Sequence, residues 1–272
     1  MKRNILFLIL FLLFYSYSSG QSFKQDFWEA LKAKDMVKAE KILQTWDFAD
    51  ANDPELYSSY FNYFTIKSLE KDSTVFENEY VKKALSFITE GIERFPTRFD
   101  MRIAKIYMLG KIKDYSSYTN EIISLINFSK KIDNNWKSEN FSLLEKPVEM
   151  LNGAVLEFQE KLLMEENTSL YKHIIQISNE MLRNYPNHVQ SRLNLSTIYI
   201  IQKEYNKSLE SLLKAIEVDK KNPILFFNIA HVYNLIGDKT NAKKYYELTI
   251  ANVEEKEEKL KVAAQRQLST LQ

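Results

Sequence analysis

With 272 residues, the chain is long enough to bury a substantial core and to form one or two domains. It contains no Cys, which excludes disulfides, thiolate metal sites and cysteine nucleophiles. Its 37 Lys and Arg residues nearly balance 36 Asp and Glu residues, so it lacks the basic excess with which proteins commonly bind nucleic-acid phosphates. We therefore expect no nucleic-acid partner.

The first twenty residues have the layout of a secretion signal. Lys2 and Arg3 precede an apolar run over residues 5–15, and small residues follow over 16–20. We expect cleavage after Gly20 and a periplasmic or secreted mature protein that begins at Gln21. The run has eleven residues, whereas a membrane-crossing helix needs about 20, so no membrane span is expected after cleavage. An uncleaved N-terminal anchor is the alternative.

The composition of the rest of the chain favours helices. Five Gly and five Pro leave few chain breakers, and the 16 Tyr and 17 Phe fall at helical spacing rather than in the alternation typical of strands. The polar stretch Ser68–Glu77 is expected as a break between helical runs. Further helices are expected near Asp100–Ile112, Tyr115–Ser129, Val148–Glu165 and Ser169–Tyr185, and a final one over Glu254–Leu271.

A 34-residue period is visible in the C-terminal half, where Val189–Asn222 can be superimposed on the segment from Pro223 onward. Each copy is interpreted as two amphipathic helices joined by a tight turn. Asn222 before Pro223 is a suitable N-cap for the second copy. The shift aligns Leu195 with Ile229, Ser196 with Ala230, Tyr199 with Tyr233, Ser208 with Ala242, Leu212 with Tyr246, Ala215 with Thr249 and Ile216 with Ile250.

Small residues occur where the two helices of each copy should cross. Ser196 and Ser208 lie twelve residues apart on opposite helices, and so do Ala230 and Ala242. Helices approach closely only where small side chains face each other. We therefore expect Ser196 to face Ser208 and Ala230 to face Ala242.

A period of 34 with paired helices resembles the tetratricopeptide repeat family, here in the form of an exported bacterial protein. The resemblance implies an all-α fold, a right-handed α-solenoid of about five to six helix hairpins with a C-terminal capping helix. Weaker copies, marked by Ala84, Ile88, Gly91 and Pro96, extend it upstream. We divide the chain into a signal peptide (1–20), degenerate repeats with insertions (21–147) and clearer repeats with the capping helix (148–272), as one continuous solenoid.

Residues that could carry catalysis or hold a metal are sparse in the sequence. His173, His188 and His231 are far apart and have no second ligand at metal-binding spacing. Neither a phosphate-binding glycine loop nor a nucleophile elbow is present. We therefore expect a protein that is not an enzyme and needs neither cofactor nor metal.

The resemblance also implies where a partner would bind, because the first helix of each repeat lines the concave surface of such arrays. The family's Lys, Asn and Arg clamp for a peptide carboxylate is absent, since Leu193 and Thr197 stand at corresponding positions. Some of the groove positions could instead pack against the neighbouring repeat. The expected groove residues are Gln190, Leu193, Thr197, Ile200, Ile224, Phe227, His231 and Asn234.

Inserted stretches are a second place to look for a partner site, because insertions in repeat arrays emerge as loops. Trp136 and Phe141 lie in a polar insertion and would be exposed aromatic anchors if that loop stands free. The alternative is that they fold back on the helix expected at Val148–Glu165.

These observations favour an exported scaffold that binds a protein or peptide through its concave face. A glycan- or small-ligand-binding module of the cell envelope is the alternative, because sugars stack on aromatic rings. A helical enzyme with an unrecognised site is a third hypothesis.

Overall fold

The computed structural model describes residues 22–70, 79–254 and 257–271. The expected signal segment and most of the break expected at Ser68–Glu77 lie outside these residues. Within them the regular structure is helical, apart from isolated bridges that join Lys137 to Arg98 and to Leu143. Six consecutive helix pairs are followed by one further helix, so the expected α-solenoid class is confirmed. The four helices expected between Asp100 and Tyr185 are present, with ends shifted by at most two residues.

The chain divides into two compact units. The first extends to Glu121 and takes in Ile132–Pro147, and the second contains Ile122–Lys131 and the chain from Val148 onward. The first unit starts with a helix over residues 22–32. It continues with α2 (Met36–Ala49), α3 (Pro54–Glu70), α4 (Glu79–Arg94), α5 (Phe99–Lys111) and the start of α6 (Tyr115–Lys131).

A glycine allows α3 and α4 to pack closely in the first unit. A Cβ atom on Gly91 would lie 2.8 Å from the Cβ of Tyr57, which is too close for any larger residue. Ala84 and Ile88 of the same helix are fully buried in this cluster. The small–large–small pattern that continued the repeat upstream therefore marks a real helix contact.

The second unit carries the clear repeats and a polar network that fixes them. Gln159 is buried, and its amide nitrogen donates to Ser178 Oγ at 2.7 Å. Asn194 donates to the Gln159 side-chain oxygen at 2.7 Å, so three helices share one buried network. After the end of α6, the elements are α7 (Pro147–Met164), a short 3₁₀ turn (Thr168–Leu170), α8 (Tyr171–Asn184), α9 (Val189–Ile201), α10 (Tyr205–Val218), α11 (Pro223–Ile236), α12 (Lys239–Asn252) and α13 (Glu258–Ser269).

The hairpins α9–α10 and α11–α12 cross at the expected small residues. The hydroxyls of Ser196 and Ser208 share a hydrogen bond of 2.7 Å, and both residues are buried. Ala230 and Ala242 are fully buried in one cluster at the equivalent crossing. Close approach of the backbones explains why each site holds a pair of small residues.

The ends of α9 and α11 are set by local capping. The Asn222 side chain accepts hydrogen bonds from the amides of Ile224 at 2.9 Å and Leu225 at 3.3 Å, and Pro223 is the first helical residue, as expected. Gly237, with φ of 90°, ends α11 in the left-handed conformation that glycine adopts without strain. His188 caps α9, because its Nδ1 accepts a hydrogen bond from the Ser191 amide at 3.3 Å.

The final helix covers the last repeat. Ala264 of α13 is fully buried with Ala230, Ala242 and Tyr246, and Leu268 packs against this cluster. The expected capping helix is therefore present, and it begins at Glu258 rather than Glu254.

Candidate functional site

The expected groove residues of α9 and α11 lie on one side of each helix. Together with Asn228, Ile201 and Leu235, which share the same side at helical spacing, we call this surface the first-helix face. A 34-residue shift relates its two halves: Gln190 to Ile224, Leu193 to Phe227, Thr197 to His231, Ile200 to Asn234 and Ile201 to Leu235. All of these side chains are half-buried or exposed. Asn228 and Leu235 were not among the expected residues, although they lie four and eleven residues after Ile224 and helical periodicity could have identified them.

Three apolar members of the face also stabilise the fold. Leu193 and Ile200 pack against the cluster formed by Leu212, Ala215, Leu225, Ile229 and Val232. Phe227 packs against the cluster of Ala230, and its ring contacts the Tyr246 ring edge-on at 5.6 Å between centroids. Structural packing therefore accounts for part of the exposed area that these three residues could offer a partner.

The polar members of the face make few contacts with the rest of the protein. Thr197 is exposed, and its hydroxyl donates to the Leu193 carbonyl of its own helix at 3.1 Å. Gln190 donates to Asn194 at 2.9 Å. The Asn234 side chain makes no hydrogen bond to any residue that the structure describes. Burial lowers the pKa of His231, so its ring is neutral near pH 7.

The inserted loop over residues 132–147 is folded back on the first unit. The Lys137 amide donates to the Thr97 carbonyl at 2.9 Å, and the Phe99 amide donates to the Lys137 carbonyl at 3.2 Å. Two backbone hydrogen bonds thus attach the loop at the start of α5.

Trp136 was expected as a possible exposed anchor, and this expectation is wrong. Its side chain is fully buried, with its ring 5.3 Å from that of Phe99 and the Arg102 guanidinium 5.7 Å above it. These contacts place the Trp136 ring on α5. Phe141 remains 42% exposed and contacts Phe95 edge-on at 6.2 Å.

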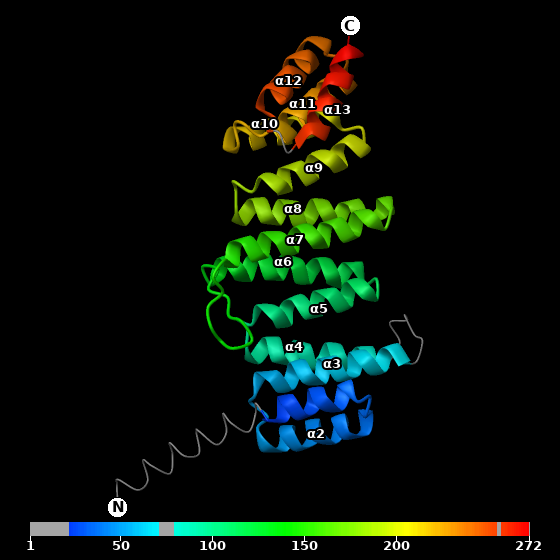
Figure 1. Cartoon of the computed structure of the whole chain (residues 1–272), viewed down its shortest axis with the longest axis vertical. Coiled ribbons are helices and arrows are strands. Elements are labelled where there is room, and N and C mark those ends of the chain that lie inside the picture. The colour runs from blue at the N-terminus through cyan, green and yellow to red at the C-terminus, as the bar shows by residue number, and fades with distance from the viewer. Residues whose placement is uncertain (1–21, 71–78, 255–256, 272) are drawn as a thin grey trace, which may run out of the picture. The chain divides into compact units, whose positions relative to one another are not determined.

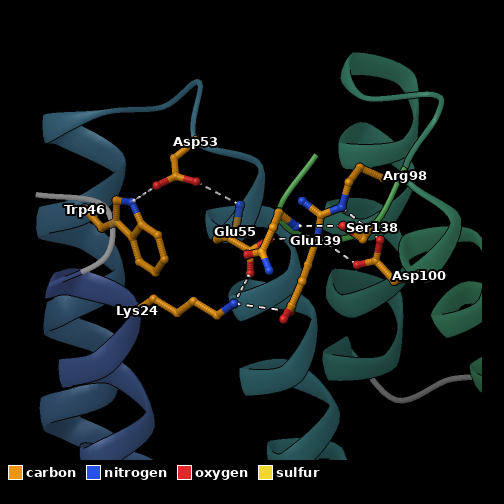
Figure 2. A network of polar contacts seen from close by, with 9 residues as sticks. Lys24, Trp46, Asp53, Glu55, Arg98, Asp100, Ser138 and Glu139 are labelled. Carbon is orange, nitrogen blue, oxygen red and sulfur yellow. Dashed lines mark hydrogen bonds and ion pairs between the residues drawn. The ribbon is translucent and has the colours of Figure 1, made fainter. Parts of the chain in front are cut away.

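A network of charges holds this loop, and Figure 2 shows its members. Glu55 of α3 accepts from Lys24 at 2.7 Å and lies 2.7 Å from Arg98, whose side chain is fully buried. Arg98 also makes two hydrogen bonds to Asp100, of 2.8 and 2.7 Å. Lys24 reaches Glu139 of the loop at 3.3 Å. The sequence pattern did not indicate this network, because its members are up to 115 residues apart.

Beside the network, Trp46 of α2 donates from its indole nitrogen to Asp53 at 3.1 Å. Asp53 also accepts from the Glu55 amide at 2.9 Å and so caps the start of α3. Burial raises the pKa of the Asp53 carboxyl, although these hydrogen bonds oppose the shift. The arrangement joins α2, α3 and α5 of the first unit by structural contacts.

Aromatic rings in the first unit stack mainly on one another. Tyr60 lies 4.1 Å from Phe87 with an angle of 11° between the rings, and Phe64 is stacked 5.6 Å from Phe87. Ring faces that a sugar would need are therefore partly used in helix packing. The glycan-binding alternative remains an untested hypothesis.

No group of three or more His, Asp or Glu side chains suited to a metal ion occurs among the residues that the structure describes. His173, His188 and His231 lie on three different elements or their ends, and burial lowers the pKa of each. None of the helices in the described part of the chain combines the length and apolar character that a membrane crossing requires.

Comparison with protein-family models identifies tetratricopeptide repeats in the second unit. A model of the TPR repeat matches residues 197–237, and a model of the tetratricopeptide repeat matches residues 225–250. These two matches span most of α9 to α12. A comparison with curated proteins gave no match.

Solved structures of repeat proteins are similar to the chain at low identity. A tetratricopeptide repeat protein from Parabacteroides merdae is 16% identical, with 87% of this chain and 81% of that one covered and a TM-score of 0.40. YrrB, described as a TPR protein with an unusual peptide-binding site, is 12% identical, with 82% and 97% covered and a TM-score of 0.42. MamA is 12% identical, with 72% and 91% covered and a TM-score of 0.42.

Proposed function

Because the chain is a tetratricopeptide-repeat protein, we propose that it is a non-enzymatic scaffold that binds a protein or peptide segment through the first-helix face. One observation carries the proposal. Equivalent positions of two consecutive hairpins form the first-helix face. Side chains such as Thr197 and Asn234 on this face are not used to pack the repeats together. A regular surface of this kind suits an extended segment that crosses both helices.

The shape of the repeats supports this choice over the outer helices. Second helices α10 and α12 bury their small residues against α9 and α11, and the first-helix face lies on another side of each first helix, where its residues are half-buried or exposed. Ile224 is 45% exposed at the start of α11, although it is a large apolar residue. An apolar residue with polar side chains around it is a common composition for a binding surface.

A capture experiment tests the proposed face. Full-length mature protein immobilised on beads should retain a specific partner from the cell envelope, and Asn234→Ala should reduce that retention at least about tenfold. Phe227→Ala is expected to have the same effect, but circular dichroism must show that this partly packed variant is folded. Glu217→Ala, on the exposed side of α10, is the matched control and should bind as the original chain does.

Equal retention by Asn234→Ala, Phe227→Ala and Glu217→Ala would place any binding site elsewhere on the protein. Retention that is lost only in Phe227→Ala, together with a lowered melting temperature, would indicate a folding defect rather than a partner contact.

We also propose that residues 1–20 direct export and are removed after Gly20. The first described helix begins at residue 22, so this cut leaves every described element intact. Lys24 and its partners Glu55 and Glu139 are kept in the mature chain. Intact mass and N-terminal sequencing of the protein from periplasmic and secreted fractions should give Gln21 as the first residue. A mass that includes Met1, found in the membrane fraction, would instead establish an uncleaved anchor.

A further inference from the structure

The first-helix face differs from the rest of the second unit in its lack of charge. Helix α11 contains no Asp, Glu, Lys or Arg, and α9 contains only Arg192. Arg192 lies off the face and donates to the Pro186 carbonyl at 3.0 Å. His231 is the only titratable group on the face, and it is neutral near pH 7 because burial lowers its pKa. The face therefore presents apolar groups, amides, one hydroxyl and a neutral imidazole.

The helices that neighbour α9 and α11 in the second unit carry exposed charged residues. Helices α10 and α12 carry exposed Lys and Glu residues. At the turn between α9 and α10, Lys203, Glu204 and Lys207 line an open hollow of about 650 Å³ together with Leu235 and Ile236. The first helices on either side are charged as well: exposed residues are Glu149, Glu157 and Glu160 on α7 and Glu258, Lys259 and Arg266 on α13. The uncharged surface is thus confined to α9 and α11.

Exposed apolar residues give this uncharged surface its character. Ile201 is 46% exposed, Ile224 45% and Leu235 39%, and all three lie on the same side of the two first helices. Single exposed apolar residues are normal on protein surfaces, but several on one face indicate an interaction surface. Ile201 and Leu235 occupy equivalent positions of the two repeats, whereas the counterpart of Ile224 is Gln190.

We propose that the segment recognised by the first-helix face is an uncharged, largely apolar stretch of another protein with amide or hydroxyl side chains. The proposal rests on the proposed function of this face. A charged side chain that lost water against α9 and α11 would find no opposite charge there, and the unpaired burial would cost free energy. Packed helices lie about 8–10 Å apart and each is about 10 Å wide, so two of them span about 20 Å. An extended chain advances about 3.3 Å per residue, so about six residues cross the face.

Selection from a display library of random 12-residue peptides, with the full mature chain as bait, tests this chemistry. The selected peptides should share a core of about six residues that is depleted in Asp, Glu, Lys and Arg. Their affinity should change less than about twofold between about 0.05 M and 0.5 M NaCl, because salt screens only charge pairs. Enrichment of charged cores, or a weakening of about tenfold with salt, would overturn the proposal.

A matched pair of variants separates this inference from the proposed function. Thr197→Asp adds a charge to the face, and Thr240→Asp makes the same change on the exposed start of α12. Thr197→Asp should weaken the selected peptides about tenfold, and Thr240→Asp should leave them unchanged. If peptides bind with equal strength to both variants, the proposed face is wrong. If Thr197→Asp loses binding but the selected peptides are charged, the location of the binding face is supported and the proposed uncharged chemistry of the peptide is wrong. Selection of no peptide, with binding of an oligosaccharide or of a second copy, overturns both.

Discussion

At the scale of single residues, the two clear repeats solve the same packing problem differently. The crossing of α9 and α10 holds Ser196 and Ser208, whose hydroxyls bond to each other at 2.7 Å. The crossing of α11 and α12 holds Ala230 and Ala242, which are fully buried and carry no polar group. Both pairs meet the requirement for small volume, but the serine pair adds a polar contact that must be satisfied.

This difference predicts the outcome of a double-mutant cycle. Ser196→Ala alone leaves the buried Ser208 hydroxyl without its partner and should lower the free energy of unfolding by about 1 kcal/mol. Ser208→Ala alone should act similarly. The double variant reproduces the alanine pair of the next repeat and should regain most of the loss. Urea denaturation of the four proteins measures the cycle, and strictly additive losses would show that the hydroxyls do not depend on each other.

At the scale of elements, the histidine that caps α9 makes the stability of this helix depend on pH. His188 accepts a hydrogen bond from the Ser191 amide through Nδ1, which is possible only when this nitrogen carries no proton. Burial lowers the pKa of His188 below its ordinary value of 6.5. The unfolded chain therefore takes up a proton first as the pH falls below about 6.5, which favours unfolding. The stability that the neutral ring contributes is fully present above about pH 6.5. It is lost as the pH falls toward the lower pKa that His188 has in the folded protein.

Replacing the cap tests this linkage. His188→Asn keeps a side-chain acceptor at the start of α9 but does not titrate. We expect the original chain to lose more stability than His188→Asn when urea midpoints are compared at about pH 7.5 and pH 5.5. Some loss should persist in the variant, because burial also lowers the pKa of His173 and His231. An identical pH dependence of both proteins would contradict the role of His188.

At the scale of the whole molecule, a stack of hairpins must close its last apolar side. Helix α13 does so by burying Ala264 beside Ala230, Ala242 and Tyr246, while Val262 of the same helix is 53% exposed. The division into two compact units means that each buries an apolar interior of its own. The closing helix therefore protects the second unit, which carries the first-helix face.

The capping role predicts different effects at two neighbouring positions. Ala264→Asp places a charge in the buried contact and should lower the free energy of unfolding by about 3 kcal/mol. Val262→Asp, the matched change on the exposed side, should alter it by less than about 0.5 kcal/mol. Thermal unfolding with light scattering measures both stability and aggregation. Equal melting temperatures for the two variants would show that α13 does not seal the repeat.

The sequence was sufficient for the helices, the 34-residue period, the serine and alanine crossings and the cap at Asn222, because each depends on residues within about one repeat. The side of α9 and α11 that carries the first-helix face also follows from helical periodicity. These features are local, and their spacing repeats along the chain.

Only the tertiary structure decided where the inserted loop packs and which charged residues of the first unit contact each other. Trp136 lies in a polar segment, yet it is buried on α5 because the loop bonds to Thr97 and Phe99 far earlier in the chain. Lys24 and Glu139 are joined over 115 residues of sequence. Such contacts depend on which distant segments meet, and no period in the sequence records that meeting.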